Sequence, residues 1–320
     1  MKRRNVLSAL ALSTLMVKAN AQDAWPQRPI RLIVPSPGGA AADVLMRLIQ
    51  EPLSKALGQP VVVDYRPGAG GAIAAQHILA KPSDGYEFVL HHNGLVTLPL
   101  VQKKPSYEVK DFTPITLIAT NPLALMSNSS VPGNLADFVK FARENRGTLE
   151  WGTASIGGVG HLALLQFNDL AGIKDTVMVP YPGGAALTHA LLAGQIKYGM
   201  SSPSETMTML VKEGRLRYLG VSNPQRDPSM PDVPSISEVL PGYSSQVWWG
   251  LIAKAGTAAP IVERMAAEIG KIIAMPEVSR RIRGMYLQPA TGGPKAFGDL
   301  IRNETQQWAT LLKTRKVSID

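Results

Sequence analysis

The sequence predicts an α/β protein made of two similar lobes. Short apolar, β-rich runs alternate with segments of helical spacing, and the same alternation starts again past residue 120. Strand–helix–strand units of this length imply a parallel sheet with right-handed crossovers, in which binding sites lie beyond the carboxyl ends of the strands. A chain of 320 residues is also long enough for two domains. We therefore expect one α/β lobe from each half of the chain.

Each half has its own series of predicted elements. In the first half, strands at 30–34, 61–63 and 87–90 alternate with helices at 44–57 and 72–79. In the second half, we predict strands at 123–126, 149–153, 177–179, 196–200 and 216–221, and helices at 135–143, 162–170, 185–192 and 206–212.

The chain is then expected to return to the first lobe. A proline-rich surface segment at 224–241 precedes a return strand at 247–253. Three helices complete the chain, and they are predicted at 260–273, 277–285 and 294–313. The expected division is residues 22–123 plus 250–320 for lobe I and residues 124–249 for lobe II.

The first 21 residues have the pattern of an export signal. Lys2, Arg3 and Arg4 precede an apolar run at 6–17, and Ala19-Asn20-Ala21 has the small-x-small pattern of a cleavage site. We expect cleavage after Ala21 and export by the Sec or the twin-arginine route, because Arg3-Arg4 fits either. No cysteine precedes the cleavage point, which excludes a lipoprotein anchor.

Composition narrows the class of protein further. The leader holds four of the 33 basic residues, which leaves 29 against 24 acidic ones. This mild excess suits an anionic ligand or serves solubility alone. The chain has no cysteine, which excludes thiol catalysis and zinc–thiolate sites. No arginine-rich run is interleaved with aromatic residues, so nucleic acid is not an expected partner.

Glycine-rich turns follow two predicted strands of the first half. Glycines let a ligand approach the backbone closely, and the helix that follows offers unpaired N–H groups to an anion. Asp43 caps its helix or contacts ligand, and the sequence leaves both open. The candidate binding residues of these turns are Ser36, Pro37, Gly38, Gly39, Ala40, Ala41, Ala42 and Asp43 in the first, and Gly68, Ala69, Gly70 and Gly71 in the second.

Two similar turns in the second half repeat this arrangement. The first contains Thr153, Ser155, Gly158 and His161, and the second contains Tyr181, Gly183 and Gly184. His161 either lines the site or makes a structural hydrogen bond. Four such loops, two from each lobe, predict a clamshell that closes on a ligand.

Enzyme signatures are absent from the sequence. The glycines at 68–71 do not have the spacing of a dinucleotide fingerprint, and no phosphate-binding Gly-Lys-Ser/Thr loop or G-x-S-x-G elbow is present. The adjacent His91 and His92 are expected to point to opposite faces of a strand, which argues against a metal site. We expect neither a metal nor a cofactor.

Many short motifs, taken in chain order, resemble one known family. They include Trp25-Pro26, the Pro-Gly-Gly loop that ends in Asp43, Arg66-Pro67-Gly68-Ala69-Gly70-Gly71, Pro82-Ser83-Asp84-Gly85-Tyr86, Val179-Pro180-Tyr181, Trp249-Gly250-Leu251 and Ala255-Gly256-Thr257. They resemble the Bug (TctC-like) periplasmic solute receptors of tripartite tricarboxylate transporters over nearly the whole mature chain. The resemblance implies a receptor with the type II periplasmic-binding-protein fold, in which crossover hinge strands join two α/β lobes. The resemblance also implies membrane transporter subunits as partners. We also expect the protein to be a monomer and not an enzyme.

The resemblance further implies a small carboxylate ligand, held by backbone N–H groups, hydroxyls and ordered water. It places the first carboxylate near residues 36–43 and 68–71, with Thr153, Ser155, Gly158 and the turn before Ala185 opposite. His92 and Asn93 occupy a strand-end loop where members often carry small hydroxyl residues. Ala41-Ala42 replace side chains that often carry hydroxyls. Ser201-Ser202 replace a region that often carries Asp or Asn, which disfavours an amino-acid ligand.

Two other functions stay open at this point. One is a sensor subunit that presents its liganded form to a two-component system. The other is an extracytoplasmic enzyme acting on a small acid, for which His161, His92 and Asp43 are the only plausible acid–base groups.

Overall fold

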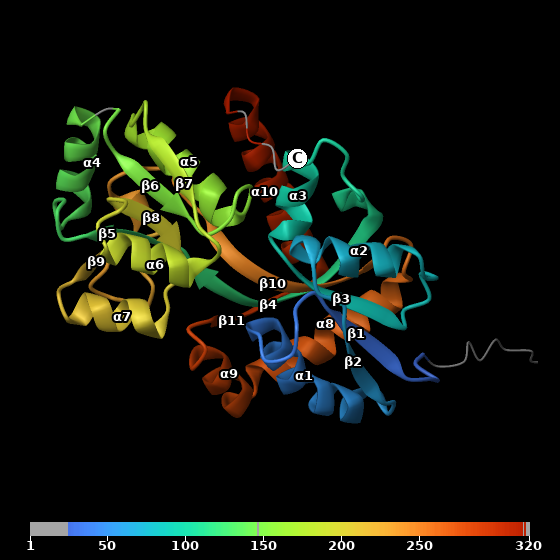
Figure 1. Ribbon diagram of the computed structural model, residues 1–320. Helices are drawn as coiled ribbons and strands as arrows, with labels where there is room; N and C mark the ends of the chain where they lie inside the picture. The colour runs from blue at the N-terminus through green and yellow to red at the C-terminus, as the bar shows by residue number, and fades with distance from the viewer. Residues whose placement is uncertain (1–24, 146, 316, 318–320) are drawn as a thin grey trace, which may run out of the picture.

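The computed structural model describes residues 25–145, 147–315 and 317. The predicted signal peptide at 1–21 lies outside these residues. The described chain forms two α/β lobes, one from β1–β3, α1–α3 and the C-terminal helices, the other from β5–β9 and α4–α7 (Figure 1). No helix in these residues is long and apolar enough to cross a membrane.

The first lobe contains a six-stranded mixed sheet. Its order is β11 (Gln288–Gly292), β4 (Phe112–Pro122), β10 (Gln246–Lys254), β3 (Glu87–His92), β1 (Ile30–Val34) and β2 (Val61–Tyr65). The strand β1 pairs in parallel with both β2 and β3, as the strand–helix alternation predicts. The strand β10 is antiparallel to both β3 and β4.

The second lobe contains a five-stranded sheet. Its order is β7 (Val177–Pro180), β6 (Glu150–Thr153), β8 (Tyr198–Ser201), β5 (Ala124–Asn128) and β9 (Leu216–Val221). The strand β6 pairs in parallel with β7 and β8, whereas β5 is antiparallel to both of its neighbours.

Ten α-helices cover these sheets in the described part of the chain. They are α1 (Ala41–Leu57), α2 (Ala72–Leu79), α3 (Gly94–Val101), α4 (Leu135–Glu144), α5 (Val159–Ala171), α6 (Gly184–Leu192), α7 (Glu205–Lys212), α8 (Ala259–Ala274), α9 (Pro276–Arg283) and α10 (Pro294–Thr314). The helical spacing of apolar residues in α1 predicted one buried face. Leu45, Ile49 and Leu53 are fully buried on that face.

The sequence did not predict α3, β4 and β11. The helix α3 is apolar on all sides, so it shows no helical period. The strands β4 and β11 contain prolines and gain their extended form from pairing with distant strands, β4 with β10 and β11 with β4.

Two neighbouring strands join the lobes. The strand β4 leads through Leu123 into β5, and the chain returns from β9 to β10, which pairs with β4 from Gln246 opposite Pro122 to Lys254 opposite Phe112. Figure 1 shows β4 and β10 side by side between the lobes. Because β10 already pairs within the first sheet at Gln246, the sequence-based boundary between 249 and 250 falls inside this strand.

The helix α10 packs closely over the centre of β10. A Cβ atom at Gly250 would lie 2.2–2.8 Å from atoms of the Phe297 ring, which is too close for an unshifted structure. Phe297 in turn packs edge-on against Trp248, with 5.2 Å between ring centroids. A glycine at 250 is therefore what lets α10 lie on the crossover strand.

We expect Gly250→Ala to lower the free energy of unfolding by about 1–3 kcal/mol, because the added methyl overpacks a filled core. Gly270→Ala is the matched control, since Gly270 lies in α8 with no atom within 4 Å of the added Cβ. There the same change should raise stability by about 0.5–1 kcal/mol, as alanine is the better helix former. Urea unfolding of both variants measures the difference, and equal effects would contradict the packing described here.

Candidate ligand-binding cleft

A cavity of about 410 Å³ lies between the two lobes. The first wall is formed by the loop after β2, the end of β3 and the helix α3. The second wall is formed by the loop before α5 and the first residue of α5. The first wall consists of Ala69, Gly70, His92, Asn93, Gly94, Thr97, Leu98 and Gln102, and the second of Ser155, Ile156, Gly157, Gly158 and Val159.

Glycines let the loops of the first wall interlock. Gly71 has φ of +98°, and a Cβ there would lie 2.8 Å from the buried ring of His91. A Cβ at Gly94 would lie 2.5 Å from the carbonyl oxygen of Gly70. The glycines of these loops therefore serve close backbone packing as well as access for a ligand.

His91 and His92 do not point to opposite faces, so that sequence-based expectation is wrong. Their ring centroids lie 5.3 Å apart, because the strand ends here and Asn93 already has helical dihedral angles. Within the described residues, no group of three or more metal-ligating side chains is present.

The protonation of His92 follows from its surroundings. The amide N–H of Gly94 donates to Nδ1 of His92 at 3.0 Å, so the neutral ring carries its proton on Nε2. Burial, with a smaller contribution from His91, lowers the pKa of His92 to about 3. His92 thus gives the cavity wall a neutral imidazole rather than a positive charge.

The side chain of Asn93 is held by the crossover strand. Its Nδ2 donates to the Gln246 carbonyl at 3.0 Å and to Oε1 of Glu304 at 2.7 Å, and its Oδ1 accepts from the Trp248 amide at 3.1 Å. Asn93 therefore ties the cavity wall to β10.

Glu304, on α10, is the centre of this network. It is buried, and beyond Asn93 it accepts from the indole Nε1 of Trp248 at 2.5 Å and of Trp308 at 2.9 Å. Burial raises the pKa of Glu304, and the hydrogen bonds from Trp248, Trp308 and Asn93 only partly offset it. Sequence reasoning missed Glu304, since a glutamate in an amphipathic helix resembles any surface position.

Asp43, in the first turn of α1, holds the loop before this helix through a hydrogen bond to the backbone. The N-cap of α1 is Ala40, so Asp43 is not the cap. Its Oδ2 accepts from the Gly39 amide at 2.7 Å, and its Oδ1 accepts from Arg47 Nε at 2.8 Å and Tyr65 Oη at 2.7 Å. Burial acts to raise the pKa of Asp43, but these hydrogen bonds together lower it, so the group stays ionised.

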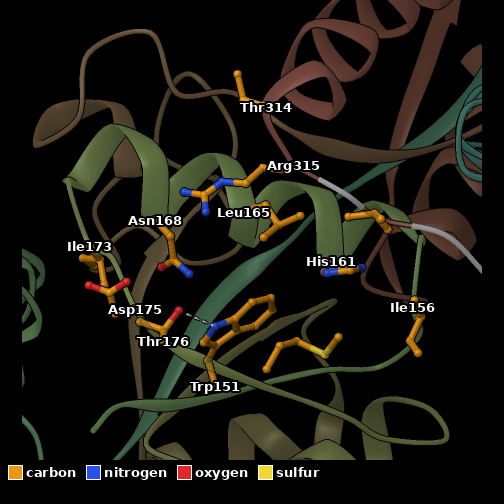
Figure 2. A pocket seen from close by; sticks show the side chains of 12 residues that line it. Trp151, Ile156, His161, Leu165, Asn168, Ile173, Asp175, Thr176, Thr314 and Arg315 are labelled. Atoms are coloured by element: carbon orange, nitrogen blue, oxygen red, sulfur yellow. Dashed lines mark hydrogen bonds between the residues drawn. The ribbon is translucent and has the colours of Figure 1, made fainter. Parts of the chain in front are cut away.

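His161 lies outside the inter-lobe cavity. The helix α5 begins at Val159, so His161 belongs to its first turn, where Nδ1 accepts from the Gly157 amide at 3.0 Å. Its ring lies 5.7 Å from that of Trp151, in a separate cavity beside α5 (Figure 2).

The remaining predicted residues of the second lobe lie together beyond the cavity lining. The Tyr181 amide donates to the Thr153 carbonyl at 2.9 Å, and the Gly183 amide donates to the Ala154 carbonyl at 3.0 Å. A Cβ at Gly184 would lie 2.9 Å from Ser201 Oγ, so the strand-end loops of β6, β7 and β8 are neighbours.

The structure thus divides the predicted site residues into two groups. Those that line the cavity are Ala69, Gly70, His92, Asn93, Ser155 and Gly158. Those that do not line it are residues 36–43, Gly68, Gly71, Thr153, His161, Tyr181, Gly183, Gly184, Ser201 and Ser202. The lining residues that were not predicted are Gly94, Thr97, Leu98, Gln102, Ile156, Gly157 and Val159. The first four were missed because no local pattern predicted α3 or the segment after it, and the other three are neighbours of the predicted Ser155 and Gly158.

Several helix N-termini lack a side-chain cap, including those of α8, α9 and α10 away from the cavity. The N-cap residues of α1, α2, α3, α5 and α6 make no side-chain cap hydrogen bond, whereas Asn134 caps α4 and Ser204 caps α7. The N-termini of α3 and α5 lie on opposite walls of the cavity. Such ends carry unpaired N–H groups and partial positive charge, which favour an anion.

We expect the stability of the protein to fall as pH rises through the raised pKa of Glu304. Above the ordinary value of 4.5 the unfolded state has released this proton while the folded state still holds it, so unfolding becomes easier with increasing pH. Glu304→Gln replaces the titrating carboxyl with an amide that does not titrate. The free energy of unfolding of this variant should therefore not show the decrease that Glu304 causes as pH rises. Urea unfolding across the pH range measures it.

Glu263→Gln is the control, because Glu263 is exposed on α8. It should keep the pH dependence of the wild type. If Glu304→Gln also kept it, Glu304 would not be the titrating group.

Two α/β lobes, two crossover strands and a cavity between them define a type II periplasmic solute-binding protein fold. The model of the tripartite tricarboxylate transporter family receptor, TctC, matches residues 45–317. The chain belongs to this family.

Individual relatives agree with the family match. The "UPF0065 protein in tcbD-tcbE intergenic region" of Pseudomonas sp. strain P51 is 36% identical over 321 residues, which covers 97% of this chain and 94% of that protein. The structure of R. palustris Rpa4515 with adipate is 30% identical with a TM-score of 0.75, and covers 92% of this chain and 99% of that one. MatC from Rhodopseudomonas palustris with bound malate is 27% identical with a TM-score of 0.70, and covers 90% and 100%.

Proposed function

We propose that the protein is a periplasmic receptor that captures a small carboxylate between its lobes and delivers it to the membrane subunits of a tripartite tricarboxylate-type transporter. The observation that carries the proposal is the pair of uncapped helix N-termini, from α3 and α5, on opposite walls of one cavity. The α5 end offers the unpaired N–H groups of its first turn. The α3 end, whose Gly94 N–H already donates to His92, contributes mainly the partial positive charge of its dipole, so a dicarboxylate can be held from both lobes at once. The export signal at 1–21 accounts for the periplasmic location in this proposal.

The composition of the cavity wall favours backbone recognition. Ala69, Gly70, Gly157 and Gly158 leave the main chain accessible. The neutral His92 adds a polar group without a fixed charge. The two relatives with adipate and malate bound support carboxylates as the ligand class.

Loops that border the cavity belong to the same proposal. Ser36, in the loop after β1, has a buried hydroxyl with no hydrogen-bond partner among the described residues. In the proposal this loop, together with Thr153, Tyr181, Gly183, Gly184, Ser201 and Ser202, surrounds the ligand when the lobes close.

The candidate acid–base groups do not lie together in the inter-lobe cavity. Of the three groups considered from the sequence, His92 alone lines the cavity, Asp43 is engaged by Gly39, Arg47 and Tyr65, and His161 faces another cavity. The geometry therefore favours binding over turnover.

A thermal-shift screen of C4–C7 dicarboxylates tests the proposal. A ligand at a hundredfold excess over its Kd should add about 2.7 kcal/mol to the free energy of unfolding. Val159→Trp places a large side chain in the cavity wall and should abolish the shift. Leu170→Trp, at the exposed far end of the same helix, should leave it unchanged. If neutral sugars or amines raised the melting temperature and no acid did, the assignment of a carboxylate ligand would be wrong.

A further inference from the structure

We propose that the second lobe holds another ligand site, in a cavity beside α5, for a small planar aromatic molecule that presents a carbonyl or carboxylate oxygen. The cavity, here called the α5 pocket, measures about 590 Å³ and lies between α5, β6 and the end of α10. Figure 2 shows Trp151, His161, Leu165, Asn168 and Arg315 arranged around one open space.

His161 supplies the first hydrogen-bond donor. Its side chain is only 4% exposed, and Nδ1 is occupied by the Gly157 amide. Burial lowers the pKa of His161 to about 4, so the ring is neutral and its proton lies on Nε2. Across the described ranges Nε2 has no hydrogen-bond partner, although the ring lines the pocket.

Asn168 supplies the second donor. It is 3% exposed, and its Oδ1 accepts from the Tyr198 hydroxyl at 3.1 Å, which fixes the orientation of the amide. The Nδ2 group has no hydrogen-bond partner in the part of the chain that the structure describes. Neither His161 Nε2 nor Asn168 Nδ2 is sealed from the cavity, so an acceptor from outside the chain can reach each of them there.

The apolar surface of the pocket sets the shape of the ligand. The Nε1 of Trp151 is already used, since it donates to Thr176 Oγ1 at 2.9 Å. What Trp151 adds to the pocket is its ring, beside Leu165 and Met178. A flat aromatic ring matches such a surface, and its oxygen is then free to meet Asn168. His161, seven residues or about 10 Å away along α5, is an alternative donor for a ligand in the reverse orientation.

The pocket rim carries no positive excess, because Arg315 is already paired and Asp175 adds a negative charge. Arg315 pairs with Asp169, its Nε lying 3.0 Å from Oδ1, and the exposed Asp175 lies on the rim as well. A uniformly positive site would demand an anion, whereas this one accepts either an aromatic carboxylate or its uncharged amide. The shared requirement is the oxygen acceptor.

The α5 pocket is distinct from the inter-lobe cavity. Their linings share only Ile156 among the described residues. The inference therefore does not rest on the proposed transport function and can be tested apart from it.

Titration of 4-fluorobenzoate and of 4-fluorobenzamide, followed by ¹⁹F NMR on the mature protein, tests the site. We expect saturable binding of at least one probe. Asn168→Asp keeps an acceptor for Tyr198 but replaces the donor, and Leu165→Trp fills the pocket without removing a polar group. Each should weaken binding at least tenfold.

Two controls locate the bound probe. Asn303→Asp makes the same change at an exposed position of α10 and should have no effect. Val159→Trp obstructs the inter-lobe cavity and should leave binding in the α5 pocket intact. The proposal is overturned if neither probe binds, or if binding is lost in Val159→Trp and unchanged in Leu165→Trp, which keeps the test valid even if Asn168→Asp fails to fold.

Discussion

Glu304 is a buried carboxylate at the junction of the hinge and the cleft, and its hydrogen-bond partners are two indoles and one amide rather than a basic side chain. Through Trp248 it holds the crossover strand β10, and through Asn93 it holds the loop that begins α3. Both the path between the lobes and one wall of the cavity therefore depend on a residue of the C-terminal helix. Removing a carboxylate from water is costly, and three donors compensate for part of that cost. The rest is met by the packing of α10 over β10.

His92 and His161 line different cavities, and a backbone N–H fixes the protonation and orientation of each ring in the same way. In His92 and in His161 a backbone N–H, from Gly94 and Gly157 respectively, occupies Nδ1. Burial keeps both rings neutral, so each is an Nε2–H donor of fixed orientation. Gly157 belongs to the loop after β6, and Gly94 is the first residue of α3, directly after the end of β3. These two segments thus orient the histidines as well as lining the cleft.

Much of the fold was predictable because local patterns agreed with tertiary packing. The strand at 30–34 and the helix at 72–79 have the predicted bounds, as both combine clear apolar runs with flanking glycine or proline. The helix α3 and the strands β4 and β11 were not predictable, because pairing and burial far along the chain decide their structure. Predicting α5 from residue 162 left His161 in the loop. With α5 beginning at Val159, His161 lies in the first turn and faces Trp151. The role of Glu304 depends on contacts that no local pattern encodes.

The interlocked glycines also limit how such a receptor can diversify. A side chain at Gly71 or Gly94 would collide with His91 or with the Gly70 carbonyl, so these positions cannot vary without rebuilding the wall. Thr97, Gln102 and Val159 line the same cavity from helices or a helix end, and side chains there can change without that penalty. Substitutions at these positions can therefore reshape the cavity, while the interlocked glycine backbone keeps its form.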